Sequence, residues 1–114
     1  MLKIYHNNRC SKSREALALL TERGLKFEVV YYLETPPDQA TLQALLQKLG
    51  VQARQLLRSK EAEYSQLGLD NPALTDEQLI AAMIKHPKLI ERPIVEWPDK
   101  AVVARPPELL LELL

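Results

Sequence analysis

Cys10 is the only cysteine of this chain, and it lies among polar and basic residues rather than apolar ones. The stretch YHNNRCSKSREAL, residues 5–17, contains it. A histidine and three cations surround it, namely His6, Arg9, Lys12 and Arg14. A single cysteine is often a small buried hydrophobe. These flanks offer no apolar socket, and they favour a reactive thiolate instead.

The spacing around the cysteine narrows the chemistry. A phosphatase loop needs an arginine six positions after the cysteine, but that position holds Ala16. Cys10 to Ser13 instead reads C-x-x-S, the monothiol counterpart of the C-x-x-C redox motif. Because Ser13 replaces the second cysteine, Cys10 has no partner within the chain that could resolve a disulfide formed on it.

The elements around Cys10 place it at the start of a helix. Residues 2–5 predict a strand, residues 11–23 a helix with a leucine and alanine stripe, and residues 25–32 a second strand. Gly24 suits the position that closes the helix. Strands separated by a helix are expected to be parallel, with a right-handed crossover. The helix begins just after Cys10, so its free N–H groups and positive dipole end would stabilise a thiolate there.

The rest of the chain predicts a helical block followed by two strands and a last helix. Asp38 can cap a helix that Gly50 closes, and residues 52–58 form a shorter helical piece. A capping-box pattern from Thr75 to Gln78 opens another helix, which ends before Pro87. Two strands follow at 93–96 and 101–104, joined by a turn at 98–100. A final helix begins at Pro106.

This order of elements predicts an α/β fold of the thioredoxin-like, or glutaredoxin-like, type. The βαβ and ββα units would build a mixed four-stranded sheet, with a helical insertion at about 38–90. At 114 residues the chain is expected to form a single domain, 1–114.

Composition and charge exclude several classes of function. Lys+Arg and Asp+Glu both total 15, so no net charge attracts nucleic acid or an anionic membrane. No run of about 20 apolar residues predicts a membrane span, and the N-terminus has no signal-peptide pattern. One cysteine and two histidines far apart in sequence argue against a metal site. A cytoplasmic monomer is the expectation.

Longer stretches resemble one known family. IYHNNRCSKSREAL resembles the opening of the glutaredoxin-coupled arsenate reductases, the ArsC family. The resemblance continues through four further stretches, YYLETPP, LLRSKEAEYSQLGL, TDEQLIAAMIKHPKLIERPIV and ARPPELLLELL, and covers essentially the whole chain. Asn7-Asn8 replaces the asparagine-proline pair typical of the family. The chain lacks the C-terminal extension of plasmid-borne members, which suggests a short, chromosomal-type member.

The resemblance implies a function and a set of site residues. It identifies Cys10 as the catalytic cysteine, His6 as the histidine that helps to ionise it, and the substrate-binding arginines Arg58, Arg92 and Arg105. It implies reduction of arsenate to arsenite with no bound cofactor, with glutathione as co-substrate and glutaredoxin as partner. Pro93 is expected to be the cis-proline that faces the cysteine and brings Arg92 beside it.

Two other functions stay open at this point. A monothiol, glutaredoxin-like thiol exchanger without arsenate activity would need the same cysteine. A regulator of the Spx type would bind RNA polymerase, but those proteins usually carry a C-x-x-C switch, and this chain has Ser13 at the second position. Each of the three arginines could also be an ordinary surface residue, since spacing alone does not select them.

Overall fold

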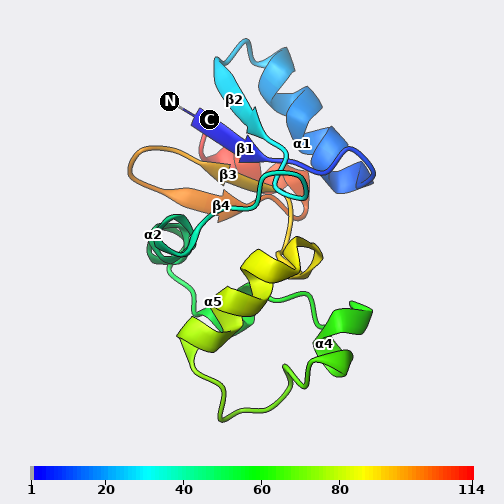
Figure 1. Cartoon of the computed structure of the whole chain (residues 1–114). Coiled ribbons are helices and arrows are strands. Elements are labelled where there is room, and N and C mark those ends of the chain that lie inside the picture. Colours follow the sequence, from blue (N-terminus) through cyan, green and yellow to red (C-terminus); the bar gives the residue numbers. More distant parts are fainter. Residues whose placement is uncertain (1) are drawn as a thin grey trace. The chain divides into compact units, whose positions relative to one another are not determined.

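Four short strands form one mixed sheet in the computed structural model, which describes residues 2–114 (Figure 1). They are β1 (Leu2–Tyr5), β2 (Phe27–Val30), β3 (Ile94–Glu96) and β4 (Ala101–Val103). The order across the sheet is β2-β1-β3-β4. β1 is parallel to β2 and antiparallel to β3, and β3 is antiparallel to β4. This topology confirms the predicted thioredoxin-like sheet.

β2 is shorter than predicted because the chain turns at Tyr31. The carbonyl of Tyr31 accepts hydrogen bonds from the backbone N–H groups of Glu34 and Thr35, at 3.0 and 2.9 Å. The two tyrosines that extended the strand pattern to residue 32 therefore belong to the turn after β2. This turn lies next to the loop that carries Cys10, because β2 and β1 are neighbouring parallel strands.

Two helical elements contribute apolar side chains to the core of the sheet unit. Helix α1 (Ser11–Glu22) is followed by Gly24, which closes it with the left-handed φ of 66°. A six-residue 3₁₀ helix, η2 (Pro107–Glu112), replaces the α-helix predicted at the C-terminal end. The core cluster lies between these helices and the sheet, with buried residues Leu2, Ile4, Ala16, Leu20, Val95, Ala104 and Leu110.

Residues 36–91 form a helical unit between β2 and β3. It contains α2 (Gln39–Leu49), α3 (Ala53–Leu56), α4 (Ala62–Gln66), α5 (Asp76–Lys85) and the 3₁₀ helix η1 (Pro87–Leu89). Asp38 caps α2 by accepting from the N–H of Thr41 at 2.8 Å, and Gly50 closes it with a φ of 70°. Both signals match the sequence prediction, as does the capping box at Thr75.

The chain folds as two compact units. One is Pro36–Glu91, and the other joins the segment up to Thr35 with Arg92–Leu114. These limits lie close to the predicted insertion at 38–90, while the single-domain organisation over 1–114 stays a prediction. Over residues 2–114, none of the helices combines the length and apolar character needed to cross a membrane.

Candidate active site

Cys10 sits at the turn between β1 and α1, where it is the N-cap residue of the helix. Its backbone is extended, with φ −94° and ψ 120°, and its side chain makes no capping hydrogen bond. Its N–H donates to the carbonyl of Asn7, and its own carbonyl accepts from the N–H of Arg14, both at 3.0 Å. The residue is 8% exposed. The sulfur thus stands at the positive end of α1, as predicted.

Arg105 brings a cation to the sulfur from the far end of the sequence. Its Nη1 lies 3.9 Å from Cys10 Sγ and 3.4 Å from the carbonyl oxygen of Arg92. A contact of this length is a weak hydrogen bond, and it places the guanidinium group beside the sulfur. The sheet explains the meeting, because β4 ends just before Arg105 and lies beside β3, which pairs with β1.

Arg92 has buried donors without partners. Its Nε and Nη1 are both buried, and neither has a hydrogen-bond partner within residues 2–114. Buried donors of a guanidinium are costly to leave unpaired, so they indicate a missing acceptor. Arg92 lies two residues before β3, and the Arg92–Pro93 peptide is cis, as expected for Pro93. Arg105–Pro106 is cis as well.

Two of the three cations that flank Cys10 in sequence have contacts elsewhere. Lys12 Nζ pairs with Glu15 at 3.7 Å, and Arg14 Nη1 donates to the carbonyl of Asn8 at 2.7 Å. Among the described residues, Arg105 is the cation that contacts Cys10 Sγ. Sequence spacing could not have found it, because 95 positions separate the two residues.

His6 is buried under the Cys10 loop, and both of its ring nitrogens are engaged. Nε2 lies 2.6 Å from Asn8 Oδ1, and Nδ1 lies 2.6 Å from Ser13 Oγ. An amide oxygen only accepts, so Nε2 carries the proton in the neutral ring, and the hydroxyl of Ser13 donates to Nδ1. Ser13 Oγ also accepts from the N–H of Asn7 at 3.0 Å.

These bonds tie the end of β1 to the first turn of α1. Ser13, the second position of the C-x-x-S motif, is fully buried as part of this network. The contacts of His6 therefore go to the loop and to Ser13. The prediction that His6 helps to ionise Cys10 stays a prediction. The sequence indicated Ser13 only as the second position of the C-x-x-S motif, and its hydrogen bonds within the loop were not predicted.

Arg58 lies in the helical unit and is paired with carboxylates there. It forms ion pairs with Glu61 and, through Nε at 3.3 Å, with Glu91. Its backbone N–H donates to the carbonyl of Leu89 at 2.8 Å. The predicted role of Arg58 in substrate binding stays a prediction.

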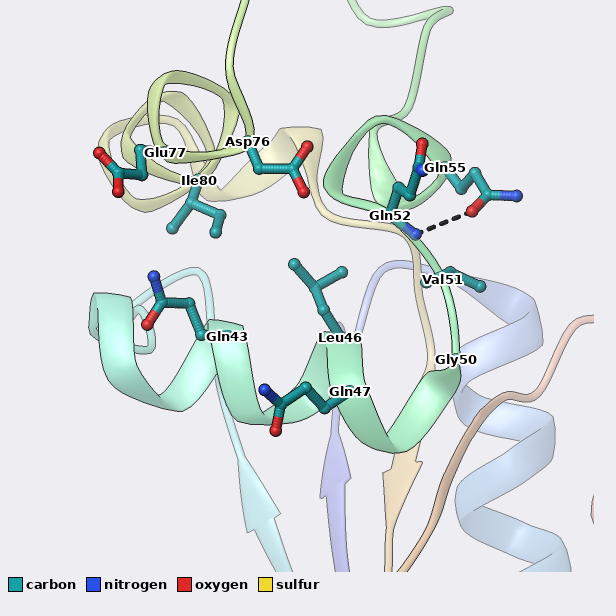
Figure 2. Close-up of a pocket in the computed structure, with 10 residues that line it drawn as sticks. All are labelled: Gln43, Leu46, Gln47, Gly50, Val51, Gln52, Gln55, Asp76, Glu77 and Ile80. Atoms are coloured by element: carbon teal, nitrogen blue, oxygen red, sulfur yellow. Dashed lines mark hydrogen bonds between the residues drawn. The ribbon is translucent and has the colours of Figure 1, made fainter.

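A large pocket lies wholly within the helical unit, where α2, α3 and α5 meet (Figure 2). Its volume is about 790 Å³. Four glutamines line it, together with the carboxylates of Asp76 and Glu77, and no lysine or arginine of the described residues does. The dashed bond in Figure 2 is the cap of α3, from the Gln52 N–H to Gln55 Oε1 at 2.8 Å. Without a cation, this pocket does not suit an oxyanion.

Comparisons with known proteins find similar sequences and structures over nearly the whole chain. The sequence model of the ArsC family matches residues 5–113. The chain is 57% identical to the "Uncharacterized protein YfgD" of Escherichia coli over 98% of this chain and 95% of that protein. It is 54% identical to an "Arsenate reductase" of Neisseria meningitidis, over 94% and 92%. A solved structure, "Arsenate reductase from Vibrio cholerae", superposes with a TM-score of 0.95 at 50% identity, covering 99% and 97%.

Proposed function

We propose, given that the chain belongs to the ArsC family, that it reduces arsenate to arsenite through the thiolate of Cys10. The observation that carries the proposal is the pair of buried, unpartnered donors on Arg92, next to the Arg105 side chain that contacts Cys10 Sγ. A relative and a solved structure that are named arsenate reductases support the choice of oxyanion.

The site answers the electrostatic problem of the first step. Arsenate is an anion and so is a thiolate, and at ~4 Å two like charges repel by about 4 kcal/mol at an effective dielectric near 20. Arginine offsets this repulsion, because its planar fork donates two parallel hydrogen bonds and stays protonated. Arg92 and Arg105 would supply the donors, and the free N–H groups of α1 would add to them.

In the first step Cys10 Sγ attacks arsenic. The S–As bond forms, an As–O bond breaks, and the departing oxygen takes up protons and leaves as water. Arsenic stays pentavalent in this adduct. The loop network of His6 and Ser13 would hold Cys10 at the start of α1 during the attack, and any help of His6 in ionising the thiol belongs to this step.

The second step needs an external thiol, because reduction takes two electrons and Cys10 is the only cysteine of the chain. The thiolate of glutathione attacks Cys10 Sγ, so that an S–S bond forms and the S–As bond breaks. The electron pair of the S–As bond stays on arsenic, which leaves as arsenite. Glutaredoxin then takes the glutathionyl group and returns Cys10 to the thiolate. A single reduced cysteine and these partners fit a monomer working in the cytoplasm, where thiols stay reduced.

A coupled assay tests the proposal. Oxidation of NADPH is followed with glutathione, glutaredoxin, glutathione reductase and arsenate. Turnover should require all of them and vanish with Cys10→Ser. Arg105→Ala should lower kcat/KM about ten- to a hundredfold, the value of one charge-assisted hydrogen bond. The matched control is Arg23→Ala, an exposed arginine at the other end of α1. Glutathione exchange on Cys10 without any arsenate turnover would instead identify a thiol exchanger.

A further inference from the structure

A second pocket lies beside the Cys10 loop, and the proposed chemistry has not yet used it. Its volume is about 320 Å³, and it is lined by residues 6–9 together with Tyr31, Leu33 and Glu34. All of these residues belong to the same compact unit as Cys10. The volume lies at the small end of the range for small-molecule sites, roughly 300–1,000 Å³. We call it the loop pocket.

The loop pocket offers two opposite charges and an apolar wall. Arg9 and Glu34 are exposed, and over residues 2–114 neither side chain has an ion-pair or hydrogen-bond partner. Tyr31 and Leu33 are 42% and 40% exposed, which places them among the few large apolar side chains open to solvent. A ligand that fits would carry a negative group, a positive group and a short stem between them.

The loop pocket and the arginines reach the Cys10 loop from opposite sides of β1. At the end of β1, Tyr5 pairs with Val30 of β2 on one side and with Ile94 of β3 on the other. The turn that carries Tyr31 to Glu34 follows β2. The two arginines of the site flank β3 and β4. Arg9 of the loop pocket is the chain neighbour of Cys10, one Cα step of about 3.8 Å away.

We propose that the loop pocket binds the thiol co-substrate, glutathione, and orients its sulfur toward Cys10; the inference rests on the proposed function. Glutathione has carboxylates and an ammonium group on a peptide stem. Arg9 binds a carboxylate, Glu34 binds the ammonium group, and the stem lies on Tyr31 and Leu33. The S–As bond breaks as the S–S bond forms, so the thiol must approach Cys10 Sγ from the side away from arsenic. The loop pocket adjoins the turn after β2, whereas the arginines flank β3 and β4, so a thiol held in the pocket would approach from the other side of β1.

The test uses thiol–disulfide exchange on the reduced protein, with no arsenate present. The thiolate of Cys10 attacks one sulfur of a disulfide, the new S–S bond forms, and the other half leaves as a thiolate. Intact-protein mass spectrometry gives the rate of modification. Three disulfides are compared: glutathione disulfide, the cationic cystamine and the neutral hydroxyethyl disulfide. The variants are Arg9→Gln and Glu34→Gln, with Arg23→Gln as the exposed control.

A crossed pattern is expected. Arg9→Gln should slow the reaction of Cys10 with glutathione disulfide about three- to fivefold, which is the effect of one exposed charge pair. It should not slow the reaction with cystamine. Glu34→Gln should slow cystamine and glutathione disulfide by a similar factor. Hydroxyethyl disulfide should react within about twofold of wild type in both variants, because it has no charge to bind. Arg23→Gln should leave all three rates unchanged.

Two results would overturn the assignment. If Arg9→Gln slowed all three disulfides alike, Arg9 would act only on the ionisation of its neighbour Cys10. If neither variant changed any rate, the loop pocket would bind none of these thiols. Since the rates are measured without arsenate, they are independent of the arsenate reductase proposal. A crossed pattern together with absent arsenate turnover would keep the loop pocket and reject arsenate as the substrate.

Discussion

Substitution of Arg92 should lower activity without lowering stability. Its Nε and Nη1 are buried and have no partner within residues 2–114. We expect Arg92→Met, which keeps a long stem and removes both donors, to abolish most arsenate turnover without weakening the fold. An ordinary structural arginine would behave in the opposite way, because its hydrogen bonds would be made inside the protein.

The magnitudes follow from those two donors. A buried donor left without an acceptor costs about 1–3 kcal/mol, so the free energy of unfolding should stay unchanged or rise by up to that amount. A charge-assisted hydrogen bond to the oxyanion contributes about 1.5–3 kcal/mol, so losing even one lowers kcat/KM about ten- to a hundredfold. Arg92→Lys should recover little, since an ammonium group cannot reproduce the two-pronged contact.

Two measurements decide the matter. Urea unfolding followed by the fluorescence of Trp97, the only tryptophan, gives stability, and the coupled NADPH assay gives kcat/KM. Arg23→Met is the control and should change neither quantity. The reasoning is refuted if Arg92→Met loses more than about 1 kcal/mol of stability while kcat/KM stays within about twofold of wild type. Arg92 would then hold the fold rather than the substrate.

Three further predictions concern the fold. The backbone N–H of Thr41 donates to Asp38 and lowers its pKa, so the ionised carboxylate stabilises the fold above the ordinary aspartate pKa. This stabilisation is lost as pH falls through the lowered pKa. In Asp38→Asn the free energy of unfolding should therefore depend less on pH in the acid range. Burial and, to a smaller extent, the Glu96 carboxylate raise the pKa of Tyr5. The free energy of unfolding should therefore fall above about pH 10 in the wild type, and should fall less in Tyr5→Phe. Urea unfolding at a series of pH values measures both. Thr75→Ala breaks a capping box and should cost about 1 kcal/mol in urea unfolding, whereas Ala73→Ser, at an exposed position of the preceding loop, should cost little.

Local signals in the sequence predicted the helix ends well. Asp38, Gly50 and Thr75 act through hydrogen bonds or backbone angles within four residues, so the pattern and the physical cause lie in the same short window. The mixed four-stranded sheet also followed from sequence, because a βαβ crossover makes β1 and β2 parallel and a hairpin makes β3 and β4 antiparallel. Helix α4 was missed because none of its residues is buried, so it has no apolar stripe to detect.

The contacts of the site were harder to predict, because they depend on the sheet rather than on neighbouring residues. Three cations near Cys10 in sequence suggested local stabilisation of the thiolate. The structure gives Lys12 and Arg14 other partners, and the contact to Cys10 Sγ comes from Arg105. Only the pairing of β1 with β3, and of β3 with β4, brings that residue to the loop. No periodicity or spacing in the chain encodes it.

In the proposed mechanism, residues of the segment Arg92–Leu114 determine which electrophile reacts with Cys10. The Cys10 loop, with its C-x-x-S motif and helix N-terminus, would serve any monothiol reaction equally well, because a helix N-terminus acts on the attacking sulfur and not on the electrophile. In the proposed reaction, guanidinium donors distinguish an oxyanion from a disulfide. Arg105 contacts Cys10 Sγ, and Arg92 has two buried donors without a partner among residues 2–114. Substitutions there should convert an arsenate reductase into a thiol exchanger while the Cys10 loop keeps its structure, whereas substitutions of His6 or Ser13 should impair both reactions together.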